Sequence, residues 1–142
     1  MNNPAYDGNN IFAKILKGEI PSYRVYEDEH AVAFMDVMPQ APGHTLVMPK
    51  QPSRNLLDAD PATLSHLVTV VQKVANAVKD AFDADGIYIA QFNEASAGQT
   101  VFHLHFHVIP RHEGAALKPH AGKMEDGGVL AENARKIIAA LA

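Results

Sequence analysis

The most informative stretch of this sequence is Phe102-His103-Leu104-His105-Phe106-His107-Val108-Ile109-Pro110, in which histidine alternates with apolar residues. Successive side chains of a strand point to opposite faces, so the three histidines share one face and the apolar residues the other. The alternation therefore predicts a strand over residues 100–109, with its apolar face on the core. Its imidazole rings would follow one another at about 6–7 Å, twice the rise of a strand.

Three imidazoles at this spacing cannot all carry a proton at neutral pH, because each cation disfavours the next. At least one ring is then neutral and able to act as a nucleophile, while a protonated neighbour stabilises an anion or protonates a leaving group. This combination suits the transfer of a phosphoryl or nucleotidyl group.

The spacing alone leaves three interpretations open: a catalytic site, a transition-metal site, and a polar sheet surface. Imidazole is a good ligand for zinc, copper and nickel. The preceding residues Ala97-Gly98-Gln99-Thr100 offer amide, hydroxyl and backbone N–H donors, which suit an anion better than a cation. The nearest upstream carboxylate is Glu94, and the strand itself offers no acid to support a metal-bound histidine.

The remainder of the chain predicts a single α+β domain, residues 1–142, with an antiparallel sheet. The longest helix is expected after Asp60-Pro61, a capping residue followed by proline, and an apolar stripe from Leu64 to Phe82 continues it. Shorter helices are expected at 10–17 and 129–141, and strands at 22–26, 31–36, 44–48 and 87–93. Residues 1–9 are expected to be a flexible leader and 112–128 an irregular tail.

Composition narrows the class of protein. The 142 residues carry a net charge of −4, which argues against broad binding to nucleic acid or to an anionic membrane. The chain has no cysteine, which excludes disulfides, cysteine-ligated metals and a thiol nucleophile, and weakly favours a cytoplasmic location. No apolar run approaches the roughly 20 residues that span a bilayer, and the first residues do not resemble a signal peptide.

The histidine segment resembles the signature of the histidine triad nucleotide-binding proteins, in which three histidines alternate with apolar residues. The resemblance extends over about residues 10–111 and includes three further stretches. These are Asn10-Ile-Phe-Ala-Lys-Ile-Leu-Lys-Gly-Glu-Ile-Pro21, Ala33-Phe-Met-Asp-Val-Met-Pro-Gln-Ala-Pro-Gly-His-Thr-Leu-Val-Met-Pro-Lys50, and Phe92-Asn-Glu leading into Gly98-Gln-Thr-Val-Phe.

This resemblance implies a five-stranded antiparallel sheet with one long helix and short terminal helices, and a homodimer in which two sheets pair into ten strands. It also implies hydrolysis of purine nucleotides at the α-phosphate, through a covalent nucleotidyl-histidine, with no metal or cofactor required. By the same resemblance His105 is the nucleophile, and His107 contacts the phosphate and assists the leaving group. His103 holds the nucleophile's ring, and His44 is a fourth, supporting histidine.

The resemblance also implies a nucleoside pocket. The base would lie among Ile11, Phe12, Ile15 and Phe34, and Asp36 would accept both ribose hydroxyls. The phosphate would be contacted by Asn93, Gly98, Gln99 and Thr100. Each residue also has a structural interpretation: the apolar ones as core, Asp36 as a turn residue and Asn93 as a strand-end cap.

The sequence departs from the family pattern in two places, of which the first removes a structural zinc site and the second bears on the leaving group. Some bacterial relatives bind a structural zinc through paired cysteines near the first helix, whereas this chain has Asn9 and Ala13 there. The phosphoramidase branch has a C-terminal tryptophan, which this chain lacks, and its tail after Arg111 does not match. The segments 99–101 and 109–111 are similar to the dinucleoside polyphosphate hydrolases, but the N-terminal half favours the phosphoramidase branch. His112 and His120 are expected on a loop surface.

Overall fold

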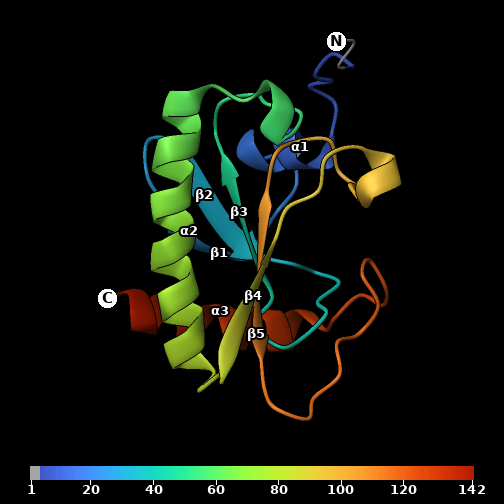
Figure 1. Ribbon diagram of the computed structural model, residues 1–142. Helices are drawn as coiled ribbons and strands as arrows, with labels where there is room; N and C mark the ends of the chain where they lie inside the picture. Colours follow the sequence, from blue (N-terminus) through green and yellow to red (C-terminus); the bar gives the residue numbers. More distant parts are fainter. Residues whose placement is uncertain (1–3) are drawn as a thin grey trace.

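Residues 4–142 are described by a computed structural model in which a five-stranded antiparallel sheet is flanked by α-helices on both faces (Figure 1). The strands are β1 (Arg24–Glu27), β2 (Ala31–Met35), β3 (Thr45–Pro49), β4 (Gly86–Ala90) and β5 (Phe106–Arg111). The α-helices are α1 (Ile11–Leu16), α2 (Pro61–Ala81) and α3 (Gly127–Leu141), with 3₁₀ turns at Leu56–Asp58 and Ala95–Ala97. The strand order is β1-β2-β3-β5-β4, and the expected α+β fold is confirmed.

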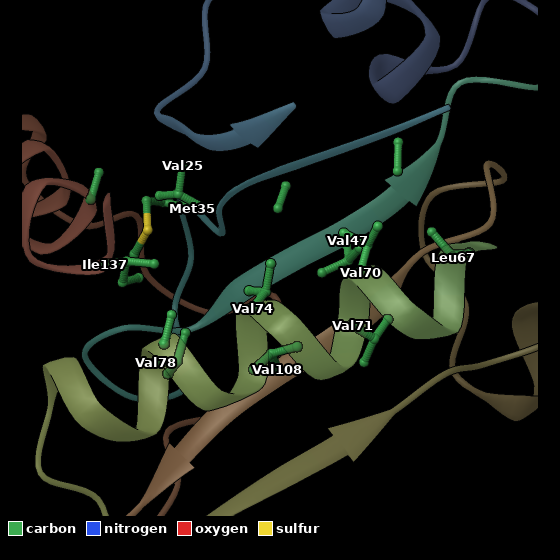
Figure 2. Packing of buried hydrophobic residues seen from close by; sticks show 14 of the residues in the cluster. Val25, Met35, Val47, Leu67, Val70, Val71, Val74, Val78, Val108 and Ile137 are labelled. Carbon is green, nitrogen blue, oxygen red and sulfur yellow. The ribbon is translucent and has the colours of Figure 1, made fainter. Parts of the chain in front are cut away.

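The central strands are buried on both faces because different helices cover each face. On one face, residues such as Ala33, Met35 and Val47 pack with α2 and α3 in the main apolar cluster. Figure 2 shows valines of α2, among them Val74 and Val78, turned toward this side of the sheet. The opposite face packs with α1 in a smaller cluster, formed by Phe12, Ile15, Val32, Phe34, Leu46 and Met48.

Helix α2 begins as its sequence predicts, since the side chain of Asp60 accepts a hydrogen bond from the Ala62 N–H at 3.1 Å and Pro61 opens the helix. Its buried residues include Val70 and Ala77, which the expected stripe leaves out, but not Val68, which the expected stripe includes. Val70 is buried, whereas Val68 is 54% exposed. A period of 3.6 residues places these two valines at opposite edges of the stripe, and Val70 is the one that packs in the main apolar cluster.

Strand β5 begins six residues later than the sequence predicts, at Phe106 rather than residue 100. Its ladder with β3 pairs Val47 with Phe106, and the chain before Phe106 leaves that ladder. The Leu104 N–H donates to the Ser53 carbonyl at 2.8 Å, so it bonds the loop after β3 instead of a strand. Only His107 of the three histidines therefore lies in a strand, although all three are buried.

The predictions of a flexible leader at residues 1–9 and of an irregular tail at residues 112–128 have different outcomes. Residues 1–3 of the expected leader lie outside the described part of the chain, and Tyr6 bonds the His103 ring instead of standing apart from the domain. The expected tail is irregular over residues 112–126, and α3 begins at Gly127. Between residues 4 and 142, no helix has the length and apolar character needed to cross a membrane.

Gly43 precedes His44 in the turn that leads into β3, and its φ of +94° lies in the left-handed region. A Cβ at this position would lie 2.6 Å from Cε2 of Phe82, at the end of α2. We expect Gly43→Ala to lower the free energy of unfolding by about 2–3 kcal/mol, from backbone strain plus overpacking. Urea unfolding followed by circular dichroism measures the change.

Gly18→Ala is the matched control, because Gly18 has a φ of +78° but a Cβ added there would meet no atom within 4 Å. It should lose only the backbone contribution, about 1 kcal/mol. Equal losses in the two variants would contradict a role for the contact with Phe82.

Candidate functional site

Two histidines of the triad line a cavity between α1 and the sheet. Its walls are apolar near α1 and polar near β5, where His105, His107 and Thr100 line it. The apolar part is lined by residues from α1, β2 and the loop after α1, including Ile11, Phe12, Ile15, Ile20, Phe34 and Leu46. A slot of this kind, apolar along its length and polar at its end, suits a flat heterocycle attached to an anionic group.

A chain of hydrogen bonds fixes where the protons of His44 and His107 lie. The Gln40 backbone N–H donates to His44 Nδ1 at 3.0 Å, so that nitrogen carries no proton. The neutral His44 ring then carries its proton on Nε2, which lies 2.9 Å from His107 Nδ1. His107 Nδ1 must accept this bond, and its own proton is therefore on Nε2. That Nε2 is buried and has no partner within the described residues.

His105 has the opposite tautomer. Its Nδ1 lies 2.6 Å from the His103 carbonyl oxygen, which can only accept, so Nδ1 carries the proton. The lone pair is left on Nε2, and the ring lines the cavity, edge-on to Phe12 at 4.8 Å between ring centroids. The rings of His105 and His107 are 5.0 Å apart. An unprotonated nitrogen thus lies beside a ring that presents an N–H.

His103 is the most enclosed residue of the triad and is not among those that line the cavity. The Tyr6 hydroxyl donates to its Nδ1 at 2.7 Å, and its Nε2–H donates to the Pro49 carbonyl at 2.8 Å. Both ring nitrogens are therefore occupied within the protein. The bond that orients His105 comes from the His103 backbone and not from its ring.

Burial keeps these rings neutral. Desolvation is the largest cause in each case, and it lowers the pKa of His105 to about 4, of His44 to about 3 and of His107 to about 2. The pKa of His103 is lowered for the same reason. Neighbouring rings add to the effect, since a proton on His105, His44 or His120 would repel one on His107.

Asp36 directly follows β2 and lines the cavity together with His105 and His107. Desolvation raises its pKa to about 6, although its Oδ1 accepts a hydrogen bond from the Met38 N–H at 2.8 Å. Its Oδ2 lies 3.4 Å from His44 Nε2. Because His44 is neutral and its Nε2–H is directed to His107, this contact is neither an ion pair nor a hydrogen bond. The apolar residues predicted to hold the base, Ile11, Phe12, Ile15 and Phe34, all line the same cavity.

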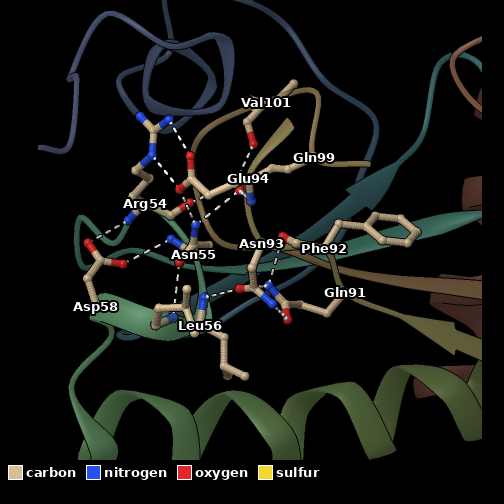
Figure 3. Close-up of polar contacts among 11 residues, drawn as sticks. Arg54, Asn55, Leu56, Asp58, Gln91, Phe92, Asn93, Glu94, Gln99 and Val101 are labelled. Atoms are coloured by element: carbon tan, nitrogen blue, oxygen red, sulfur yellow. Dashed lines mark hydrogen bonds and ion pairs between the residues drawn. The ribbon is translucent and has the colours of Figure 1, made fainter. Parts of the chain in front are cut away.

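Three of the four residues predicted to contact phosphate do not line the cavity. Gln99 is 3% exposed, and its side chain donates to the carbonyls of Arg54 and Val101 and accepts from Glu94 N and Asn55 (Figure 3). Asn93 accepts from the Leu56 N–H and exchanges hydrogen bonds with Gln91. The side-chain amides of Gln99 and Asn93 therefore form hydrogen bonds that stabilise the loop of residues 93–101. Gly98, with a φ of +106°, ends the 3₁₀ turn in this loop. Thr100 alone of the four lines the cavity.

Sequence reasoning missed the residues that complete this loop. Arg54 forms a two-pronged pair with Glu94, at 2.8 and 2.9 Å, and lies over the Phe102 ring at 4.1 Å. The hydrogen bonds tie Glu94, which has a φ of +76°, into its unusual backbone conformation. No local pattern identifies Arg54, because its partner is forty positions away along the chain.

The prediction that His120 lies on a loop surface, away from the site, is wrong. It lines the cavity, and its ring centroid lies 5.3 Å from that of His107. Its segment has no periodicity, so the sequence held no sign of this position. His112, by contrast, is exposed as expected and bonds the Phe82 carbonyl at 2.9 Å.

Within residues 4–142, one group of side chains is compact enough to hold a metal ion: Asp36, His44 and His107, whose ligand atoms lie within 4.8 Å of one another. A cation there would need lone pairs on both His44 Nε2 and His107 Nδ1. The Gln40 N–H occupies the other nitrogen of His44, so Nε2 holds a proton and offers no lone pair. The donor set therefore fits a metal poorly.

The pH dependence of stability provides a test of the neutral rings. In the unfolded chain histidine binds a proton below about pH 6.5, whereas the folded pKa values of His44, His105 and His107 are about 3, 4 and 2. Below pH 6.5 the unfolded state binds more protons, so its stability relative to the native state rises as the pH falls. We expect the free energy of unfolding to decrease from pH 7.5 to 5.5, by about 1 kcal/mol for each buried ring.

Asp36 opposes this trend weakly, since its raised pKa makes the native state bind a proton between about pH 6 and 4. Urea titrations at pH 7.5 and 5.5 measure the net change in the free energy of unfolding. His105→Asn should reduce this change by the contribution of one histidine. A free energy of unfolding that does not change over this range would contradict the assignment of neutral rings.

The comparisons with known proteins agree with this geometry. A hit-like protein from Bartonella henselae, described as involved in cell-cycle regulation and crystallised with an unknown ligand, is 62% identical, with a TM-score of 0.90 over 96% of this chain and 99% of that one. A hypothetical histidine triad nucleotide-binding protein from Sulfolobus tokodaii is 38% identical, with a TM-score of 0.84 over 92% and 90% of the two chains.

Among curated proteins, the adenylylsulfatase HINT3 of Arabidopsis thaliana is 32% identical over 121 residues, which are 81% of this chain and 61% of that protein. The model of the HIT domain matches residues 17–114, which include β1 to β5 and the four buried histidines His44, His103, His105 and His107. The chain belongs to the HIT domain family.

Proposed function

We propose that this protein is a nucleotide hydrolase that cleaves purine nucleoside phosphoramidates, or related nucleotide conjugates, at the α-phosphate. The observation that carries the proposal is the pair of fixed tautomers. His105 offers an unprotonated Nε2 to the cavity, and His107, 5.0 Å away between ring centroids, offers an unpartnered Nε2–H. A nucleophile beside a preorganised donor is what attack on phosphorus requires.

In the proposed reaction, the lone pair of His105 Nε2 attacks the α-phosphorus and forms a P–N bond. The bond from phosphorus to the leaving group breaks, and its electron pair goes to the departing atom. The Nδ1–H bond to the His103 carbonyl stabilises the charge that His105 gains. The Nε2–H of His107 donates to a phosphoryl oxygen, where it needs no reorganisation. Water then cleaves the nucleotidyl-histidine, which restores His105.

The rest of the cavity supports a nucleoside. Phe12 and Phe34 lie edge-to-face at 5.3 Å between centroids, and with Ile11 and Ile15 they form a slot for a base. Asp36 lines the same cavity, and its Oδ2, 3.4 Å from His44 Nε2, would accept ribose hydroxyls in place of that contact. Thr100 contributes a hydroxyl at the phosphate end.

The proposal allows leaving groups other than the amine of a phosphoramidate. The Arabidopsis relative is named an adenylylsulfatase, which indicates attack on an α-phosphate with sulfate leaving. A dinucleoside polyphosphate would present the same α-phosphate with a nucleotide leaving. All three substrate types require the same two histidines, so the reaction at phosphorus is common to them.

We expect His105→Ala to lower kcat/KM for adenosine 5′-phosphoramidate by more than about 10³-fold, because removal of a nucleophile abolishes the covalent route. A panel with adenylyl sulfate and diadenosine tetraphosphate ranks the leaving groups. Mass spectrometry of wild-type enzyme, quenched without acid, should find a nucleotidyl adduct on His105. His112→Ala, at an exposed ring outside the cavity, is the matched control.

Two further measurements test whether the protein is instead a metal enzyme or a nucleotide-binding scaffold. Stoichiometric metal in protein purified without an affinity tag, with activity lost to a chelator, would favour a metal enzyme. If the protein bound AMP but turned over none of the panel, a nucleotide-binding scaffold would replace the hydrolase. Turnover by His105→Ala at the wild-type rate would refute the covalent mechanism.

We also propose that the protein is a homodimer, with two β4 strands adjacent in a ten-stranded sheet. Strand β4 is the outermost strand beside β5, and its Tyr88 and Ile89 are 43% and 40% exposed. Such an uncovered edge strand is a surface that proteins normally pair or protect. Light scattering should give twice the monomer mass of 15.4 kDa, and Ile89→Asp should shift it toward the monomer. A monomeric wild type at micromolar concentration would contradict the dimer.

A further inference from the structure

The irregular segment before α3 is held against the loop between β2 and β3. The Lys118 N–H donates to the Gln40 carbonyl at 2.8 Å, and the Gln40 side chain donates to the Lys118 carbonyl at 3.2 Å. Farther along, the Glu125 N–H donates to the Val37 carbonyl at 2.8 Å. The segment from Lys118 to Glu125 is therefore fixed at both ends beside the cavity.

His120 lies between these two attachments and faces the histidines of the cavity. Its ring is edge-on to His107, at 5.3 Å between centroids, and tilted against Phe92 at 5.8 Å. The next residue, Ala121, adopts a left-handed φ of +52° and also lines the cavity. A non-glycine residue in this region is uncommon, and here it accompanies the turn that brings His120 over His107.

The proposed reaction needs a proton that the buried histidines cannot supply. An alkylamine or alkoxide leaving group must be protonated as it departs. If His107 gave up its Nε2 proton, it would need another from His44, and His44 in turn accepts only from the Gln40 amide. That amide cannot donate a proton to the chain, so the relay ends there. The proton of His105 is directed at the His103 carbonyl.

His120 differs from these four rings in its access to water. It is partly exposed, whereas His44, His103, His105 and His107 are all 7% exposed or less. It can therefore exchange protons with solvent while its ring remains in contact with His107. Among the described histidines it alone both lines the cavity and has this access.

We propose that His120 is the general acid that protonates the leaving group, and the general base that later activates water. This inference rests on the proposed function of the site. As His105 attacks, the electron pair of the breaking bond takes a proton from the His120 imidazolium, and the neutral amine or alcohol departs. Water then attacks phosphorus, its proton passes to the neutral His120, and the electron pair of the P–N bond returns to His105.

Two substrates with the same nucleoside and different leaving groups test this role. We expect His120→Ala to lower kcat/KM for an alkylamine phosphoramidate of AMP by about 10²–10⁴-fold, the usual contribution of a general acid. The p-nitrophenyl ester of AMP should change by no more than about threefold, because p-nitrophenolate departs without a proton. Both are measured on one sample, so their ratio is independent of any loss of folded protein.

A positional role for His120 would give a different result. Added imidazole should restore turnover of the phosphoramidate by His120→Ala, since it replaces the proton donor but not the packing. His112→Ala is the matched control, because His112 is an exposed histidine in the irregular stretch 112–126 and does not line the cavity. It should leave the turnover of both substrates unchanged. Asp36→Asn tests the other cavity acid, and should affect both substrates alike if that carboxylate only binds the nucleoside.

The outcomes separate this proposal from the one on which it rests. If wild-type enzyme turned over neither substrate, the proposed function would fail and this role with it. If wild type and the His105 variant behaved as proposed, but His120→Ala lost both substrates equally or neither, the role of His120 alone would be overturned. Leaving-group dependence in Asp36→Asn and not in His120→Ala would assign the acid to Asp36.

Discussion

The hydrogen bond from the Gln40 backbone N–H to His44 Nδ1 is the contact on which the chemistry of the site depends. It decides which nitrogen of His44 carries the proton, and through the next bond it decides the tautomer of His107. A backbone amide cannot change its protonation state, so the direction of the whole chain is fixed. The result is an Nε2–H on His107, a ring that lines the cavity, and this N–H has no partner within the described residues.

The fold supplies this contact through the turn between β2 and β3. The residues between β2 and β3 include Pro39, Pro42 and Gly43, and the turn closes with the His44 N–H donating to the Ala41 carbonyl. Gly43 allows the left-handed backbone of this turn, and its lack of a Cβ leaves room for Phe82. Gln40 also holds Lys118, so the same turn sets the tautomer of His44 and the position of the segment that bears His120.

Burial makes these arrangements chemically useful. A solvent-exposed histidine would be partly protonated near neutral pH, and its lone pair would be lost for that fraction of time. The two sets of helices cover both faces of the central strands, and the enclosed rings stay neutral as a result. A hydrogen bond to each ring offsets much of the penalty for burying it, which is why the triad is compatible with a stable core.

The sequence by itself determined the α+β class, the helix after Asp60-Pro61 and the grouping of the histidines, because periodicity and capping act between residues close along the chain. Its resemblance to a family also indicated the cavity residues Phe12, Phe34 and Asp36. Tertiary structure alone decided that Leu104 bonds Ser53 instead of a strand, that Gln99 is consumed in the Arg54–Glu94 loop, and that His120 reaches His107. Those contacts join residues far apart along the chain, and a local pattern does not record which backbone group a distant side chain will meet.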